Sequence, residues 1–298
     1  MKPQEILSRR LFLHTSSLWL GTSVIDGMAQ DLKARPLIRI GLVTDLHYAE
    51  KPPGGTRHYR ESAKKLSEAV ALFQQEKPDF VIELGDLVDA AQTADEEIRY
   101  LKTINTILGE VDCPRHYVLG NHCVTTLTKE QFYQTCQAKK TGYYSWDQEG
   151  VHFIVLDACY QKDFKDYRPG NFEWSDPNIP PKELAWLTKD LAATTLPTVV
   201  FVHQRLDLEP ASPYAIKQSP EIRKVLETSG KVRAVFQGHS HKNELHEIAN
   251  IPYCTVAAMV EGSGEANSAY GMLEVYEDGA LQLKGFRKQE SRSLPGHQ

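Results

Sequence analysis

Short apolar runs rich in β-branched residues alternate along this chain with segments that have the spacing of amphipathic helices. The runs cover residues 37–43, 80–84, 116–120, 152–157, 198–202 and 232–236. Each has the length and composition of a buried strand. Between the first two runs, an apolar stripe recurs at helical spacing, formed by Ala63, Leu66, Val70 and Phe73. This alternation predicts an α/β fold.

The C-terminal part of the chain follows a different pattern. Residues 253–259, 270–276 and 280–286 are predicted to be neighbouring strands, with Asp278-Gly279 as a two-residue hairpin turn. Ahead of them, Ser219 and Pro220 are predicted to cap and begin a helix that ends at Gly230. The strands should therefore form a parallel portion followed by an antiparallel one. We expect a single domain over residues 30–298, with its core at about 36–288.

The N-terminus has the composition of an export signal. Arg9 and Arg10 precede an apolar run that ends in small residues, and the order SRRLFL at 8–13 resembles a twin-arginine motif. Residues 1–29 are therefore expected to be a signal peptide, cleaved after Ala29 and recognised by the twin-arginine export machinery. This predicts a periplasmic or secreted protein that is exported already folded.

The alternative for the same segment is an uncleaved membrane anchor. Its apolar stretch is about 15 residues long, whereas a spanning helix needs roughly 20. Polar residues at 14–17 also interrupt it. No other segment of the sequence is long and apolar enough to span a bilayer.

Charge and cysteine content exclude two further classes. A formal net charge of -5 provides no general basic surface for a nucleic-acid polymer. The five cysteines form no C-x-x-C pair, and their odd number does not fit a disulfide framework. Most are expected to be buried small hydrophobic residues. The sequence does not indicate an oligomeric state.

Residues of metal-binding type follow five of the predicted strands directly. They are Asp45 and His47, then Asp86, then Asn121 with His122, then His203, and finally His239 and His241. Ligands of open α/β sheets bind beyond the carboxyl ends of the strands. These residues are therefore expected to converge although they are far apart in the sequence.

Each motif also has an ordinary structural interpretation. The D-x-H segment at 45–47 is short enough to occur by chance, Asp86 fits a strand-end turn, and Asp89 fits a helix cap. A single histidine such as His203 is often a hydrogen-bonded core residue. Five such coincidences at strand ends together favour one shared site.

The ligand types indicate two metal ions. Two carboxylates, one amide oxygen and four imidazoles exceed the four ligands of a closed zinc site and are too rich in nitrogen for calcium. Divalent or trivalent transition-metal ions fit this set, with Mn or Fe expected first and Zn or Co as alternatives. Such a pair of ions binds phosphoryl oxygens and supplies hydroxide. The expected reaction is hydrolysis of a phosphate ester or anhydride.

In their order, D-x-H, G-D, G-N-H, a single H and G-H-x-H resemble the motifs of the calcineurin-like metallophosphoesterases. The resemblance implies a four-layer α/β/β/α sandwich of mixed sheets. It implies two ligand sets bridged by Asp86, namely Asp45, His47 and His241 for one ion and Asn121, His203 and His239 for the other. It also implies that His122 is catalytic, because this histidine contacts the substrate phosphate and assists the leaving oxygen.

Further segments are similar to the manganese-dependent ADP-ribose/CDP-alcohol diphosphatases. They are GTRHYRES at 55–62, ELGDLVDA, YYSW at 143–146, FIVLDACY and VEGSGEANSAYGMLEVY. This resemblance gives a substrate-binding role to Arg57, His58, Tyr59 and Arg60. The arginines would receive a phosphate and the rings would stack against a base or sugar. The alternative is a solvated loop leading into the first helix.

Two positions depart from the family pattern. Gln204 and Arg205 follow His203 where many relatives have a proline close behind, and Arg205 is either a further phosphate ligand or a surface arginine. Cys123 stands where relatives usually carry Glu or Asp. We expect it beside the substrate site as a small, partly buried residue, not as a nucleophile, because no base is paired with its thiol.

The predicted function is therefore that of an exported dinuclear phosphoesterase using metal-bound hydroxide. Its substrate is expected to be small and phosphorylated, with a nucleotide diphosphate such as ADP-ribose or a CDP-alcohol as the first choice. One alternative is a broad-specificity phosphomonoesterase or phosphodiesterase, resembling an alkaline phosphatase or a cyclic nucleotide phosphodiesterase, because the metal core does not distinguish these reactions. A noncatalytic metal-binding scaffold is the alternative from another class.

Overall fold

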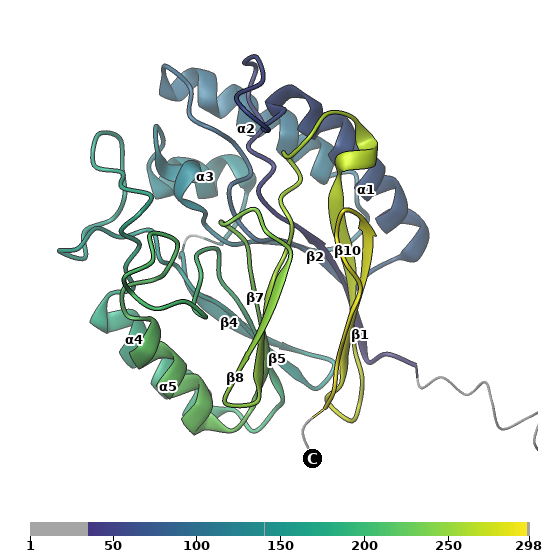
Figure 1. Cartoon of the computed structure of the whole chain (residues 1–298), viewed down its shortest axis with the longest axis vertical. Helices are drawn as coiled ribbons and strands as arrows, with labels where there is room; N and C mark the ends of the chain where they lie inside the picture. The colour runs from purple at the N-terminus through teal and green to yellow at the C-terminus, as the bar shows by residue number, and fades with distance from the viewer. Residues whose placement is uncertain (1–34, 140, 297–298) are drawn as a thin grey trace, which may run out of the picture. The chain divides into compact units, whose positions relative to one another are not determined.

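The computed structural model describes residues 35–139 and 141–296. In these residues the chain forms twelve strands and five α-helices, and the strands make two six-stranded sheets (Figure 1). The predicted signal peptide at 1–29 lies outside the described residues. Among the helices of the described part, none combines the length and apolarity that a membrane span requires.

The first sheet has the strand order β12-β11-β10-β1-β2-β3. Its strands are β1 (Ile38–Val43), β2 (Phe80–Glu83), β3 (Arg115–Tyr117), β10 (Ala269–Val275), β11 (Leu281–Arg287) and β12 (Arg292–Leu294). β1, β2 and β3 run parallel, whereas β10, β11 and β12 add to β1 as an antiparallel series. The carboxyl ends of the three parallel strands therefore lie at one end of this sheet.

The second sheet has the strand order β4-β5-β6-β7-β9-β8. Its strands are β4 (Tyr144–Gln148), β5 (Val151–Val155), β6 (Thr198–Phe201), β7 (Val232–Gln237), β8 (Glu244–Ile248) and β9 (Ile251–Thr255). The four inner strands are parallel, and β4 and β8 pair antiparallel at the two edges. Both sheets are thus mixed, as predicted.

Helices cover the outer face of each sheet (Figure 1). The helices α1 (Ser62–Glu76), α2 (Ala94–Leu108) and α3 (Lys129–Cys136) pack on the first sheet, and α4 (Pro181–Ala193) and α5 (Ser219–Ser229) pack on the second. A separate apolar cluster that includes Ile40, Phe80 and Phe153 fills the space between the sheets. The layers follow the order α/β/β/α, which confirms the predicted fold.

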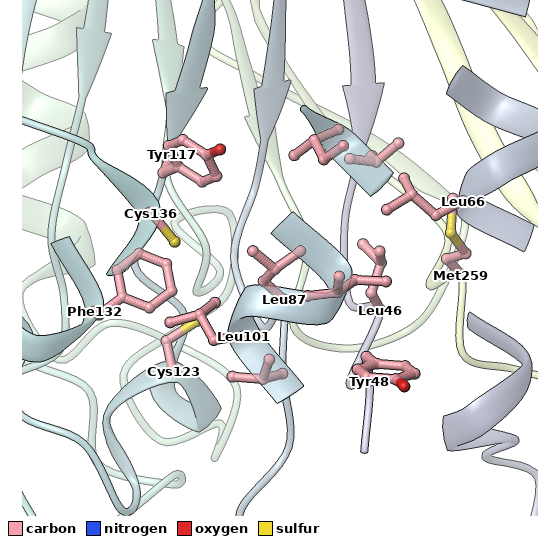
Figure 2. Packing of buried hydrophobic residues seen from close by; sticks show 14 of the residues in the cluster. Leu46, Tyr48, Leu66, Leu87, Leu101, Tyr117, Cys123, Phe132, Cys136 and Met259 are labelled. Carbon is pink, nitrogen blue, oxygen red and sulfur yellow. The ribbon is translucent and has the colours of Figure 1, made fainter. Parts of the chain in front are cut away.

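The predicted apolar stripe forms the buried face of α1. Leu66, Val70 and Phe73 are at most 1% exposed. Figure 2 shows the cluster to which they belong, where Leu66 of α1, Leu101 of α2 and Phe132 of α3 all contribute. Full burial of such a side chain contributes roughly 1.5–3 kcal/mol. Packing therefore fixes the helices that flank the site.

Three details differ from the sequence predictions. Strand β9 is not a neighbour of β10, because it lies in the second sheet beside β7. The hairpin between β10 and β11 has a three-residue loop, since the N–H of Tyr276 donates to the oxygen of Ala280 and Gly279 has a φ of 80°. Ser219 does not cap α5, because its hydroxyl donates to the Leu208 oxygen.

Candidate metal centre

The residues of metal-binding type converge where five parallel strands end. Asp45 and His47 follow β1, Asp86 follows β2, Asn121 follows β3, His203 follows β6, and His239 and His241 follow β7. Six of the seven are at most 7% exposed, and His241 is partly buried. Both sheets therefore supply side chains to one site.

Asp45, His47 and His241 form the first close group. The Nε2 atoms of His47 and His241 lie 3.0 Å apart. Oδ1 of Asp45 lies 3.7 Å from Nε2 of His47 and 3.3 Å from Nε2 of His241. Donor atoms at these separations can share one ion, because metal–nitrogen and metal–oxygen bonds are about 2.0–2.2 Å long.

Asp86, His203 and His239 form the second close group. Oδ2 of Asp86 lies 3.0 Å from Nε2 of His203 and 3.6 Å from Nε2 of His47, so this carboxylate faces both groups. Asn121 is buried beside them, and Nε2 of Gln204 donates to its Oδ1 at 3.4 Å. The structure thus brings together all seven residues that the sequence proposed as ligands, and their coordination stays a prediction.

Several donor atoms of the site are buried and have no hydrogen-bond partner among the described residues. They include Oδ1 of Asp45 and Nε2 of His203 and His239. An unsatisfied buried polar atom costs about 1–3 kcal/mol. Carboxylate and imidazole donors together suit the transition metals named above. The residues present therefore fit a pair of such ions.

Burial and neighbouring charges set the protonation of these groups. Burial lowers the pKa of His47 to about 4 and that of His239 to about 3, so both offer a lone pair at neutral pH. Burial also acts to lower the pKa of His203, but the Asp86 and Asp45 carboxylates raise it to about 9. Burial acts to raise the pKa of Asp86, yet His203 and other imidazoles hold it well below its usual range. Ionised carboxylates in this buried site need compensating positive charge.

Five of the seven residues have a left-handed backbone conformation. The φ angles are 50° at Asp45, 45° at His47, 59° at Asp86, 67° at His239 and 58° at His241. Such conformations cost non-glycine residues about 1–3 kcal/mol each and persist only where the surrounding structure enforces them. Backbone hydrogen bonds between adjacent loops enforce these conformations here. For example, the N–H of Asp45 donates to the oxygen of Gly85 at 2.9 Å.

Glycines ahead of two motifs allow the chain to approach the carboxylates. A Cβ on Gly120 would lie 2.2 Å from Oδ1 of Asp86, and one on Gly238 would lie 2.5 Å from Oδ2 of Asp45. No larger residue fits at these positions without moving a carboxylate.

His122 lies beside both groups and lines the pocket above them. Its backbone N–H donates to Oδ1 of Asp86 at 2.7 Å, and its Nδ1 lies 3.0 Å from Oδ1 of Asp89. Asp89 is not the helix cap that the sequence suggested, because Thr93 caps α2. In the sequence, the only signal for Asp89 was the spacing G-D-x-x-D. The Asp89 carboxylate orients the ring of His122 through Nδ1, and Nε2 has no hydrogen-bond partner among the described residues.

A pocket of about 410 Å³ opens over the two groups. Four of the proposed ligands line it, namely Asp86, Asn121, His239 and His241, together with His122, Arg57, Phe172, Trp174 and Tyr214. The rings of Trp174 and Tyr214 have centroids 5.6 Å apart and are 41% and 36% exposed. These aromatic residues come from irregular segments, so no periodic pattern in the sequence marked them.

The four residues of the Arg-rich segment, 57–60, do not all face the pocket. Arg57 lines the pocket, but Arg60 points to Glu50, with its Nε 3.1 Å from a carboxylate oxygen and half of its side chain exposed. Nδ1 of His58 lies 3.1 Å from Glu61, and the ring of Tyr59 lies beneath Lys51. Only Arg57 of the four residues lies in the pocket over the proposed ligands.

Arg205 does not reach this pocket. It is 1% exposed, and its guanidinium donates to Asp207 at 2.7 Å, to the hydroxyl of Ser240 at 2.9 Å and to Glu244 at 2.7 Å. The proposed phosphate contact is therefore replaced by a buried ion-pair network. Because Ser240 stands between His239 and His241, this network holds their loop.

Cys123 also lies away from the pocket. It is fully buried in the apolar cluster that Figure 2 shows, and burial raises the pKa of its thiol well above the usual value. A core role replaces the proposed place beside the substrate. All five cysteines are unpaired in the structure. Four of them are buried, and the sequence predicted burial for most of the five.

Close groups of carboxylate and imidazole atoms lie at the strand ends of an α/β/β/α sandwich, an arrangement that suits metal-assisted hydrolysis. The family model described as calcineurin-like phosphoesterase matches residues 38–243. The chain belongs to this family.

Relatives are similar over most of the chain. The manganese-dependent ADP-ribose/CDP-alcohol diphosphatase of Oryza sativa subsp. japonica is 24% identical, over 87% of this chain and 94% of the relative. The protein of the same name from Xenopus laevis is 23% identical, over 87% and 90%. A dimetal phosphatase structure from Danio rerio aligns with a TM-score of 0.77 at 19% identity, over 88% of this chain and 100% of that chain. The structural likeness shows the shared fold.

Proposed function

We propose that this protein is an exported dinuclear metallophosphoesterase that hydrolyses the diphosphate bond of a nucleotide-type substrate. The observation that carries the proposal is the pocket, which combines the proposed metal ligands with exposed aromatic rings and Arg57. The relatives are manganese-dependent ADP-ribose/CDP-alcohol diphosphatases, which supports manganese as the metal and a nucleotide diphosphate as the substrate.

The proposed ligands divide the work of holding the ions. Asp45, His47 and His241 would hold one, Asn121, His203 and His239 would hold the other, and Asp86 would contact both. Bound ions would supply Lewis acidity for the phosphoryl oxygens and make a water molecule more acidic. His122, oriented through Nδ1 by Asp89, would give a proton from Nε2 to the leaving oxygen.

The remaining pocket residues favour a substrate with more than one phosphate. Trp174 and Tyr214 are partly exposed in the pocket, and aromatic rings there would offer a nucleobase a surface for stacking. Arg57 carries a permanent charge and can bind the phosphate that is not attacked. A simple monoester would leave the arginine or the aromatic rings without a partner.

The deciding experiment compares substrates on the manganese-loaded protein with a measured metal content. We expect two ions per chain and a higher kcat/KM for ADP-ribose and CDP-alcohols than for p-nitrophenyl phosphate or its bis ester. A preference for the p-nitrophenyl esters would favour the broad-specificity alternative. Two bound ions without turnover of any substrate would favour a noncatalytic scaffold, and fewer than about one ion per chain would contradict the two-metal site.

Arg57→Ala is expected to raise KM for nucleotide diphosphates while leaving kcat for p-nitrophenyl phosphate unchanged. The physical reason is that Arg57 lines the pocket, where losing a charge-assisted hydrogen bond removes about 1.5–3 kcal/mol. Arg60→Ala is the matched control, because Arg60 lies in the same segment but contacts Glu50. Equal kinetic constants for the two variants would indicate that the segment is a solvated surface loop without a role in substrate binding.

Export is proposed from the sequence alone, since residues 1–29 lie outside the described residues. The double change Arg9→Lys and Arg10→Lys should keep the full-length protein in the cytoplasm of a bacterial host with twin-arginine export. Fractionation followed by N-terminal sequencing would also distinguish cleavage after Ala29 from an uncleaved anchor.

A further inference from the structure

Lys65 of α1 is a buried cation with an unusual set of partners. It is fully buried, and its Nζ donates to three backbone oxygens, those of Met259 and Glu261 at 2.9 Å and that of Gly262 at 2.7 Å. An ammonium group has three N–H donors, so the three oxygens satisfy all of them. Lys65 therefore holds the irregular segment 259–262, which we call the clamp loop.

The clamp loop is joined to the first ligand group in two ways. Its backbone contacts the chain beside β1, where the N–H of Val260 donates to the oxygen of Asp45 at 3.1 Å. Its one charged side chain, Glu261, places Oε1 2.6 Å from Nδ1 of His241. A carboxylate in this position fixes which nitrogen of His241 carries the proton, so that Nε2 faces Asp45 and His47.

The clamp loop also places Arg57. The N–H of Gly262 donates to the oxygen of Thr56 at 2.8 Å, and the N–H of His58 donates to the oxygen of Val260 at 2.9 Å. Arg57 lies between these two hydrogen bonds and lines the pocket. One buried lysine thus supports both a proposed metal ligand and a proposed phosphate-binding arginine.

We infer that Lys65 and Glu261 are positioning residues for the metal centre, and that Glu261 acts on the Asp45, His47 and His241 group in particular. The inference rests on the ligand sets of the proposed function. The second group is supported differently, because Nδ1 of His203 contacts the neutral oxygen of Leu84 at 2.9 Å. A carboxylate makes its imidazole a stronger donor than a carbonyl does, so the two groups should respond unequally to loss of Glu261.

The test is a manganese titration of the folded, metal-free full-length protein by calorimetry, without substrate. Glu261→Gln is expected to raise one of the two manganese dissociation constants by roughly 10- to 100-fold and to leave the other unchanged. Glu265→Gln is the matched control, because Glu265 lies in the same connection and pairs only with Lys64 among the described residues. Unchanged constants, or an equal loss in both, would overturn the role of Glu261.

Lys65→Met is expected to raise the same manganese dissociation constant. It should also raise KM for nucleotide diphosphates, because the clamp loop positions the segment that contains Arg57. Lys64→Met is its control, with a side chain that is 76% exposed on the same helix. If Lys65→Met does not fold, Lys65→Gln is the second variant. It keeps two N–H donors on a side chain one atom shorter and should raise the same dissociation constant by a smaller factor. A folded Lys65 variant with the metal constants and KM of the wild type would overturn the role of Lys65.

The outcome is separable from that of the proposed function. A wild-type protein that binds two ions but does not hydrolyse nucleotide diphosphates would refute the substrate and leave the metal comparison valid. A wild-type protein that binds fewer than about one ion per chain would refute the two-metal assignment itself.

Discussion

At the scale of single residues, a change at His122 can distinguish a role in catalysis from a role in metal binding. His122→Ala should lower kcat by roughly 10²- to 10⁴-fold, because a positioned general acid contributes that much. Metal content should stay at the wild-type value, since neither proposed ligand set includes His122, although its ring forms a third close group of possible ligand atoms with His47 and Asp89. Metal analysis and kinetics on one preparation would check this, and loss of metal would make His122 a ligand.

The ligand residues were accessible from sequence because metal chemistry demands particular atoms at strand ends. The buried position of Arg205 was not accessible, since Ser240 in the loop after β7 and Glu244 at the start of β8 are brought near it only by the fold. Cys123 was misplaced for a related reason. It immediately follows His122, but one residue along a 3-10 turn is enough to point its side chain into the core.

At the scale of elements, the turn after β3 must contain a glycine, because a side chain at position 120 would occupy the space of the Asp86 carboxylate. Gly120→Ala should reduce metal content and activity together, because the new Cβ would lie 2.2 Å from the Asp86 carboxylate. Gly230→Ala is the comparison, since it strains the end of α5 at a φ of 64° with open space around it. That change should cost about 1 kcal/mol of stability and leave metal content intact. Metal loss in both variants would contradict a local effect.

The central strands were predicted and three edge strands were missed, for a physical reason. Buried strands carry an apolar signal on both faces, whereas β4, β8 and β12 lie at sheet edges. In β8 the three central residues are exposed, so its sequence shows no apolar run. The sequence also could not predict which sheet contains β9, because an apolar run does not specify its partner strand.

At the scale of the whole molecule, buried carboxyl groups make stability depend on pH. Burial raises the pKa of Glu97 in α2 to about 7 from an ordinary value of 4.5, and the Asp89 carboxylate acts in the same direction. The folded chain therefore binds this proton more tightly than the unfolded chain. The stability that protonated Glu97 contributes is present below about pH 4.5 and is lost as pH rises through about 7.

Glu97→Gln should remove that loss. The difference in free energy of unfolding between variant and wild type should grow in favour of the variant by up to roughly 3 kcal/mol between about pH 5 and about pH 8, at about 1.4 kcal/mol per pKa unit. Urea unfolding of both proteins at the two pH values would measure it. A difference that does not change with pH would contradict an elevated pKa.

The two proposed ligand sets each draw residues from both sheets, which has a consequence for how long the folded protein lasts. Asp45 follows a strand of the first sheet and His241 a strand of the second, so an ion held by both ties the halves of the sandwich together. Opening the fold would then require the ion to leave first, which slows unfolding without any change in the apolar core. Manganese-loaded protein should survive a nonspecific protease longer than chelated protein, and equal half-lives would contradict this coupling. The proposed export would place the protein outside the cytoplasm, where the ions proposed for hydrolysis would also give it durability.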